Sequence, residues 1–265
     1  MNFAICYNTF IPLRSDPSEK SEMISQILFG EYVEIIENDK TTGYSKVRNS
    51  FDDYEGWCTI SLLHPLELKD IISLKENKIS ITRDILMPLE AKDGISRLYL
   101  GAGSTVYVNK NLTLEVRGIS YIIPERLSIT QEYKTQERII SSAKKFINIP
   151  YLWGGRSSFG IDCSGFVQNI YKQAGIPLPR DAWQQSECGK LISFIEESLP
   201  GDIMFFDNED GKITHTGIFL GNNKIIHSSG RVRIDSIDHQ GIFSAEVQKY
   251  THKLRIIRRI IFDLI

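Results

Sequence analysis

The sequence has few cysteines, no excess of charge of either sign and no long apolar run. Its four cysteines are Cys6, Cys58, Cys163 and Cys188, scattered along 265 residues without a C-x-x-C pair. This spacing argues against a zinc-ribbon ligand set, and so few cysteines in a long chain argue against a disulfide framework. A reduced compartment fits this cysteine usage.

Charge and hydrophobicity exclude two further classes of partner. The formal net charge of -2 gives no general electrostatic reason to expect nucleic acid or an anionic membrane. No apolar run approaches the roughly 20 residues of a membrane span. The first residues, MNFAICYNTFIPLR, lack a basic start, a sustained apolar core and a small-residue cleavage site. We therefore expect a cytoplasmic protein, with export as the alternative if the sequence lacks a native signal peptide.

The first half of the chain has the pattern of short strands and turns. The segments LRSDPSEKSEMISQILFGEYVEII, YSKV and YEGW resemble a bacterial SH3 domain, which we place at residues 1–66. Further along, RLYLGAGSTVYV echoes QILFGEYVEII. This internal echo predicts a second, more diverged SH3-like β-barrel at residues 67–128, with an irregular linker as the alternative.

Residues 129–265 change to a pattern of helices followed by strands. Apolar residues at helical spacing predict helices over 136–147 and 161–175. Alternating segments then predict an antiparallel sheet, including a hairpin over 215–227. The fold class is therefore α+β, with two small SH3-like barrels ahead of a domain in which helices pack on a sheet.

Cys163 stands at the first turn of the second predicted helix. Asp162 is a good N-cap, and Gly175 followed by Pro177 is a good stop. Backbone N–H groups and the helix dipole at this end favour a thiolate, the nucleophilic form of cysteine. A buried structural cysteine is the alternative.

Two histidines downstream can complete such a site. A cysteine nucleophile needs a base, and the base needs a third group that fixes its orientation. His215 and His227 lie on the two strands of the predicted hairpin, and an odd-numbered loop would bring them to one face. Packing that face against the cysteine helix would gather all three side chains. A lone histidine on a strand is more often a surface residue. Two histidines on the same hairpin, downstream of a helix-capped cysteine, make a catalytic role a stronger alternative.

The segments YLWGGRSSFGIDCSGFVQNIYKQAGIPLPRDAWQQS, LPGDIMFF and ITHTGIFLGNNKIIHSSG resemble the NlpC/P60 family of papain-like cysteine peptidases. The resemblance covers about residues 136–265. It implies that Cys163 is the nucleophile, His215 the general base and His227 the residue that orients the base. It also implies that Tyr151 lies near the oxyanion, and the first oxyanion donor should be the Cys163 N–H.

SH3-like domains ahead of this domain resemble a narrower group, whose members cleave the γ-D-glutamyl–L-diamino acid bond of murein stem peptides. Its substrates carry a free N-terminal L-Ala, and the product is L-Ala-γ-D-Glu. The resemblance implies that Asp181 holds the substrate amine and that Ser164 and Trp153 line the dipeptide pocket. Asp162 is a further candidate, although its role could be limited to the N-cap.

In this group the first SH3 domain contributes a tyrosine and an acid that close the amine end of the pocket. Tyr54 is our candidate tyrosine, with Glu22 or Glu19 as the acid. Ordinary surface residues of a barrel are an equally good interpretation.

We expect no cofactor and no metal; zinc bound by Cys163, His215 and His227 conflicts with ligand spacing. The other three histidines, His64, His239 and His252, should be solvated. The expected partner is a murein stem peptide, and the expected state is a monomer. Three other functions stay open: a general cell-wall endopeptidase, a wall-binding SH3 protein with a secondary catalytic domain, and acyl or amide transfer by the same residues.

Overall fold

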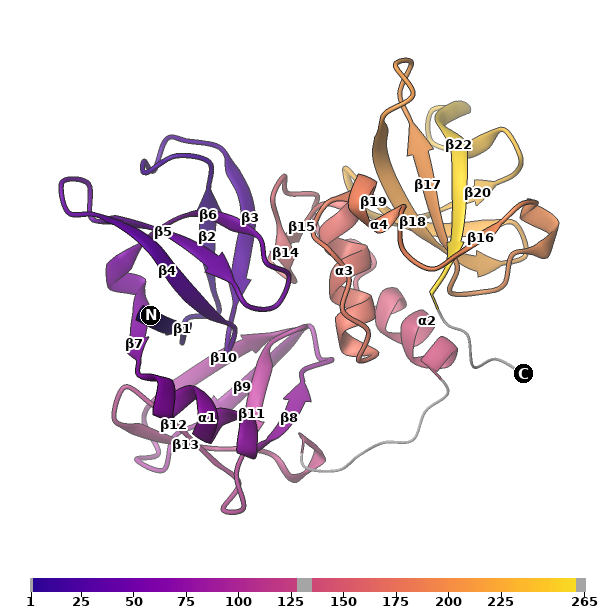
Figure 1. Cartoon of the computed structure of the whole chain (residues 1–265). Coiled ribbons are helices and arrows are strands. Elements are labelled where there is room, and N and C mark those ends of the chain that lie inside the picture. Colours follow the sequence, from indigo (N-terminus) through magenta and orange to yellow (C-terminus); the bar gives the residue numbers. More distant parts are fainter. Residues whose placement is uncertain (1, 128–134, 261–265) are drawn as a thin grey trace. The chain divides into compact units, whose positions relative to one another are not determined.

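The computed structural model describes residues 2–127 and 135–260. The chain divides into two compact units, Met1–Glu132 and Tyr133–Ile265 (Figure 1). The first unit is rich in strands, and the second combines helices with a sheet, which confirms the predicted α+β class. The predicted boundary at residues 128 and 129 lies outside the described residues, and the boundary at residue 66 stays a prediction.

Seven short strands build the first half of the N-terminal unit, in one sheet of order β3-β2-β6-β5-β4-β1-β7. They are β1 (Asn2–Cys6), β2 (Phe10–Arg14), β3 (Met23–Leu28), β4 (Tyr32–Asp39), β5 (Tyr44–Asn49), β6 (Glu55–Thr59) and β7 (Leu63–Leu66), with a 3₁₀ turn at Ile60–Leu62. Buried and partly exposed side chains alternate along β2 and β6. This period of two places the inward residues in a common core that includes Leu13, Val33 and Val47.

The second half begins with a short helix, α1 (Leu68–Glu76), which the sequence pattern did not predict. Six strands follow in three antiparallel pairs, β8 with β11, β9 with β10 and β12 with β13. They are β8 (Lys78–Ile81), β9 (Leu86–Glu90), β10 (Arg97–Gly101), β11 (Thr105–Val108), β12 (Thr113–Val116) and β13 (Ile119–Ile122), ahead of a 3₁₀ turn at Glu125–Leu127.

The two halves of this unit share a core. Phe29 from the first half packs among the buried residues of the second, and its carbonyl accepts from the Thr105 N–H at 2.8 Å. Next to it, Gly30 has a φ of +77°, and a Cβ there would lie 1.9 Å from the Thr105 carbonyl oxygen. Glycine at position 30 is therefore what lets the two halves approach each other.

The C-terminal unit has three α-helices and a seven-stranded sheet of order β16-β22-β17-β18-β19-β20-β21 among its described residues. Its helices are α2 (Thr135–Lys145), α3 (Cys163–Gln173) and α4 (Ala182–Gln185), with a 3₁₀ turn at Ile195–Glu197. Its strands are β14 (Arg156–Ser157), β15 (Gly160–Ile161), β16 (Lys190–Ile192), β17 (Ile203–Asp207), β18 (Ile213–Gly221), β19 (Lys224–Ser229), β20 (Arg231–Ile237), β21 (Gly241–Ser244) and β22 (Lys249–Arg259). Because β22 also pairs with β21, the strands from β17 to β22 close on themselves as a barrel.

Both predicted helices and the predicted hairpin of this unit are confirmed, as α2, α3 and β18–β19. Asn222 and Asn223 form the hairpin turn with φ of 50° and 54°, a conformation that asparagine tolerates better than most residues. The barrel core includes Met204, Phe206 and Ile225, and α3 packs against β18 and β19. In the part of the chain that the structure describes, no helix combines the length and apolarity needed to cross a membrane.

Candidate active site

Cys163 is the first residue of α3, as predicted, and Asp162 is the N-cap of that helix. The Asp162 Oδ1 atom accepts from the Gly165 N–H at 2.7 Å. The cap satisfies one of the N–H groups that have no partner within the helix. The first turn of α3, which carries the sulfur, is thereby fixed.

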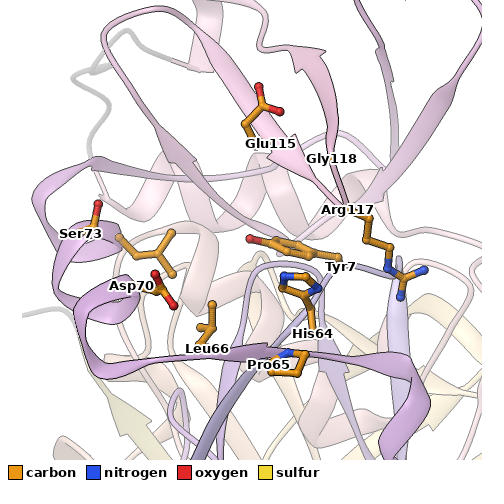
Figure 2. A pocket seen from close by; sticks show the side chains of 10 residues that line it. Tyr7, His64, Pro65, Leu66, Asp70, Ser73, Glu115, Arg117 and Gly118 are labelled. Atoms are coloured by element: carbon orange, nitrogen blue, oxygen red, sulfur yellow. The ribbon is translucent and has the colours of Figure 1, made fainter.

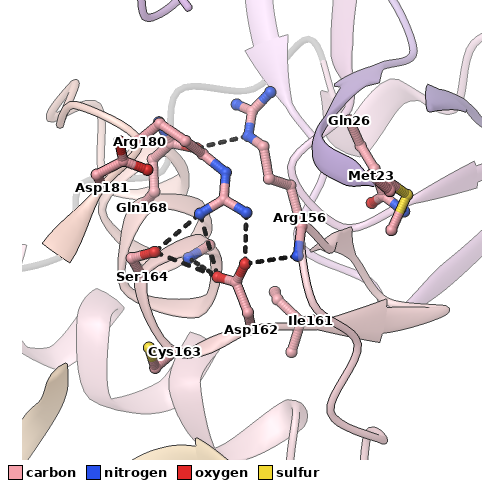
Figure 3. Close-up of polar contacts among 12 residues, drawn as sticks. Met23, Gln26, Arg156, Ile161, Asp162, Cys163, Ser164, Gln168, Arg180 and Asp181 are labelled. Atoms are coloured by element: carbon pink, nitrogen blue, oxygen red, sulfur yellow. Dashed lines mark hydrogen bonds and ion pairs between the residues drawn. The ribbon is translucent and has the colours of Figure 1, made fainter. Parts of the chain in front are cut away.

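Arg180 binds the same carboxylate and is itself buried (Figure 3). Its Nη2 donates to Asp162 Oδ2 at 2.5 Å, while Nη1 donates to Asp162 Oδ1 at 3.1 Å and to Ser164 Oγ at 2.8 Å. The Gly154 N–H also donates to Asp162 Oδ2, at 2.9 Å. A buried carboxylate is tolerated when it is paired in this way. Asp162 therefore does more than cap α3, and Arg180 is a structural partner that the sequence interpretation missed.

The glycine-rich stretch before the helix lies directly against its first turn. A Cβ at Gly165 would be only 2.2 Å from the Gly155 carbonyl oxygen. That same carbonyl accepts from the Asp162 N–H at 3.1 Å. A side chain at position 165 would push the loop that contains Gly155 away from the helix. Glycine at position 165 is therefore needed for the loop to pack against the first turn of α3.

The Cys163 sulfur lies beside the strand that carries His215. Its Sγ is 4.0 Å from the carbonyl oxygen of Thr214. Burial raises the pKa of the Cys163 thiol to about 12, and the Asp162 carboxylate adds to this, against the lowering effect of the Thr216 backbone N–H. This raised pKa runs against the predicted preference for a thiolate, because desolvation outweighs the helix terminus.

His215 and His227 face each other across the β18–β19 hairpin. Gly217 pairs with His227 in this hairpin, so His215, two residues earlier, lies on the same face as His227. The His215 Nε2 and His227 Nδ1 atoms are 2.8 Å apart. A Cβ at Gly217 would come within 2.8 Å of the His227 Cβ. Glycine at this position leaves room for the second imidazole.

Asp235 on β20 extends the pair into a series of three. The His227 Nε2 and Asp235 Oδ2 atoms are 3.0 Å apart, and Arg233 Nε donates to the same oxygen at 2.8 Å. Although burial raises it, the hydrogen bonds from His227 and Arg233 leave the pKa of the Asp235 carboxyl below its ordinary value. An ionised carboxylate only accepts, so His227 carries its proton on Nε2.

This assignment fixes the tautomer of His215. With its proton on Nε2, neutral His227 offers Nδ1 as an acceptor, and His215 must donate from its own Nε2. The His215 Nδ1 is then the nitrogen with a free lone pair. Burial, followed by the neighbouring His227 and His252, lowers the pKa of His215 well below its ordinary value, so the ring is neutral and can accept a proton.

His252 belongs to this cluster, and the prediction that it is solvated is wrong. Its ring stacks on His215 with centroids 4.0 Å apart and an interplanar angle of 26°. Burial lowers the pKa of His252 to about 4. The residue lies on β22, which closes the barrel next to β17, and this closure brings it beside a strand nearly forty positions earlier in sequence.

The other residues that the resemblance implied lie in the same unit. Tyr151 is partly buried, and burial, followed by the nearby Cys163 and Asp162, raises the pKa of its phenol. Trp153 is 60% exposed, whereas Ser164 is buried against Arg180. The predicted roles of these three residues stay predictions.

Asp181 is partly buried and caps α4 in a reciprocal capping box with Gln184. The Asp181 N–H donates to Gln184 Oε1 at 3.1 Å. Asp181 directly follows Arg180 in the sequence. These two neighbours therefore act at different helices: Arg180 binds the N-cap residue of α3, and Asp181 is the N-cap of α4. Its role as an amine ligand stays a prediction.

Tyr54, Glu22 and Glu19 belong to the N-terminal unit. Tyr54 packs against the core of the first half, and both glutamates are exposed. None of the three lines the cavity of about 460 Å³ in this unit, where Tyr7 and His64 lie between helix α1 and the β12–β13 hairpin (Figure 2). Their role in closing a substrate pocket stays a prediction.

Within residues 2–127 and 135–260, no group of three or more His, Cys, Asp or Glu side chains is arranged to hold a metal ion.

The residue of this candidate site that sequence reasoning missed most clearly is Asp235. Its signal was available: Gly230, with a φ of +70°, marks the turn between β19 and β20. In that hairpin His227 pairs with Arg233, which leaves Asp235 two residues along on the same face.

Two protein-family models match this chain. The NlpC/P60 family model matches residues 148–251, and the model of the bacterial dipeptidyl-peptidase SH3 domain matches residues 13–63. The first match spans Cys163, His215, His227 and Asp235, and it ends one residue before His252.

Similar proteins include two named peptidases and a solved NlpC/P60 structure. A γ-D-glutamyl-L-lysine dipeptidyl-peptidase of Bacillus subtilis is 42% identical over 106 residues, covering 39% of this chain and 36% of its own length. One of the same name from Bacillus cereus is 33% identical over 159 residues, covering 59% of this chain and 45% of its own length. The matches thus span less than half of either relative. A solved NlpC/P60 family structure from Bacillus cereus covers 97% of this chain and 99% of its own, with a TM-score of 0.82 at 18% identity, which shows the shared fold.

Proposed function

Because the chain contains an NlpC/P60 domain behind a bacterial SH3 domain, we propose that it is a cysteine peptidase of murein stem peptides. The bond hydrolysed is that between the γ-carboxyl of D-glutamate and an L-diamino acid, in a peptide with a free N-terminal L-Ala. The observation that carries the proposal is the hydrogen-bonded series His215–His227–Asp235, with the sulfur of the helix-capped Cys163 4.0 Å from the carbonyl oxygen of Thr214, which precedes His215. The names of the two Bacillus relatives support the choice of bond.

In the acylation step, the Cys163 sulfur attacks the γ-carbonyl carbon while its proton passes to His215 Nδ1. Since the thiol pKa is raised and the His215 pKa is lowered, the resting pair is neutral and the proton moves during attack. His227 and Asp235 then stabilise the positively charged His215 ring. His227 accepts a hydrogen bond from His215 and donates one to the negatively charged Asp235. The leaving amine takes the proton from His215, and L-Ala-γ-D-Glu remains on the sulfur as a thioester.

The oxyanion of the tetrahedral intermediate needs donors that are already in place. The Cys163 N–H belongs to the first turn of α3, where backbone N–H groups lack helical partners. The Tyr151 phenol, whose pKa is raised, stays protonated and offers a second donor. Water, deprotonated by His215, then attacks the thioester, releases the dipeptide and restores the thiol.

The test is incubation with L-Ala-γ-D-Glu-L-Lys, with products identified by mass, and with the α-linked isomer L-Ala-α-D-Glu-L-Lys as the matched control. The proposal expects L-Ala-γ-D-Glu from the first peptide and no cleavage of the second. An intact γ-linked peptide, or equal cleavage of both isomers, would overturn it. The monomeric state and the cytoplasmic location remain predictions for sedimentation and cell fractionation.

A further inference from the structure

A cavity of about 650 Å³ lies in the C-terminal unit, at the beginning of β22. Its walls come from the β17–β18 turn, from Gln240 and from β22 itself, and they include Asp207, Glu209, His252, Lys253 and Arg255. Apart from His252, none of these residues takes part in the catalytic cluster described above. The volume lies within the range of about 300–1,000 Å³ that is usual for small-molecule sites.

His252 joins this cavity to the catalytic base. His252 is one of the residues that line the cavity, and its ring stacks on His215 at a centroid distance of 4.0 Å. One wall residue of the cavity therefore contacts the residue that, in the proposed reaction, gives a proton to the leaving amine. In a hydrolysis through a thioester, the residue that leaves with that amine lies next to the base while the proton is transferred.

Asp207 gives the cavity a carboxylate in which one oxygen atom has no hydrogen-bond partner among the described residues. Its side chain is 5% exposed, and its nearest cation is the Arg255 Nε, 3.7 Å away. The Asp207 Oδ1 atom is buried and has no hydrogen-bond partner among the described residues. Buried polar atoms in native proteins are almost always paired, so an unpaired carboxylate oxygen in a cavity wall points to a cationic ligand group.

Two cations stand on the β22 side of the same cavity. Lys253 and Arg255 are both exposed, and Lys253 pairs with Asp207 in the strand register. A ligand that carries both an ammonium group and a carboxylate can satisfy Asp207 and these cations together. A purely anionic ligand would leave the Asp207 charge unmatched, and a purely apolar ligand would match neither charge.

We propose that this cavity binds the leaving-group residue of the substrate, an L-diamino acid, with its side-chain ammonium at Asp207 and its carboxylate at Lys253 and Arg255. This inference rests on the proposed function, because it assigns a place to the amine-side product of that reaction. It makes Asp207 the residue that selects a diamino acid over an apolar one. One charge-assisted hydrogen bond of this kind corresponds to about a 10- to 100-fold preference.

The test compares kcat/KM for L-Ala-γ-D-Glu-L-Lys and for the same peptide ending in L-norleucine, which lacks only the ammonium. The wild-type protein should prefer lysine by about 10- to 100-fold, and Asp207→Asn should bring that ratio close to one. Asp210→Asn is the matched control, since Asp210 is an exposed carboxylate in the same turn that does not line the cavity. The control should keep the wild-type ratio.

A second measurement keeps the inference testable without turnover or a variant. Free L-lysine should raise the Tm of the wild-type protein at millimolar concentration, and L-norleucine should not. Equal kcat/KM for the two peptides in the wild type would overturn the diamino acid site and leave the proposed function standing. Failure to cleave either peptide would sink the proposed function, and the Tm comparison would then decide the inference alone: a lysine-specific rise supports it and its absence overturns it.

Discussion

Replacing Asp235 by Asn should make His215 a weaker base without changing how the substrate binds. Asp235 accepts from His227 Nε2 at 3.0 Å, and this bond fixes which nitrogen of each histidine carries the proton. An Asn in the same place loses the charge that stabilises the imidazolium. The loss of one hydrogen bond to a charged group, about 1.5–3 kcal/mol, lowers kcat by about 10- to 100-fold.

The loss grows if the amide turns its NH2 group toward His227. The His227 ring would then carry its proton on Nδ1 and donate to His215 Nε2, which places the His215 proton on Nδ1 and removes the base. The corresponding exchange in a Ser-His-Asp triad costs about 10⁴ in kcat because the tautomer is wrong. We therefore expect a fall in kcat between these limits, with KM nearly unchanged.

The assay pairs kcat and KM on L-Ala-γ-D-Glu-L-Lys with NMR of the imidazole nitrogens, which reports the tautomers directly. Glu246→Gln is the matched control, because Glu246 also binds Arg233, at 2.8 Å, but is exposed and contacts neither histidine in the hydrogen-bond series. A kcat within threefold of wild type for Asp235→Asn would refute the role of Asp235 in setting the protonation of His227 and His215. So would an equal loss in Glu246→Gln, which would assign the effect to Arg233.

Three further predictions concern the substrate amine, the buried histidines and the β18–β19 hairpin. Acetylating the substrate amine should lower kcat/KM, and Asp181→Asn should narrow the gap between free and acetylated peptides; comparable wild-type values for the two would remove the amine-binding role. Because the folded-state pKa values of His215, His227 and His252 lie below 6.5, the unfolded chain binds more protons in acid, so the free energy of unfolding should fall as pH drops below 6.5. Denaturant melts between pH 7 and pH 5 check the sign. Gly217→Ala should lower both Tm and kcat, since its Cβ would lie 2.8 Å from the His227 Cβ, and an unchanged variant would contradict the close approach.

The elements that carry the chemistry could be predicted because local signals specify them. Asp162 and the apolar spacing after it predict α3, and Asn222-Asn223 predicts the turn that brings His215 and His227 to one face. What local signals could not supply is long-range register. His252 reaches His215 only because β22 closes the barrel, and Arg180 reaches Asp162 only through packing of the loop before α4.

Burial is the other property that the sequence could not settle. The helix terminus predicted a lowered pKa for Cys163, and the backbone N–H groups do act in that direction. The packing of α3 against β18 removes the sulfur from water, and the cost of desolvating a thiolate is larger. In the proposed mechanism, His215 therefore takes the proton from Cys163 during attack, and no thiolate is formed in advance.

The most direct test of the central claim is the rate of L-Ala-γ-D-Glu release by Cys163→Ala beside Cys188→Ala, a matched change at a partly exposed cysteine outside the cluster. With both variants shown to be folded by thermal melts, Cys163→Ala should lose about three orders of magnitude or more in kcat, the usual result of removing a nucleophile. Cys188→Ala should turn over at the wild-type rate. Turnover by Cys163→Ala above a tenth of wild type would contradict the assignment of Cys163 as the nucleophile.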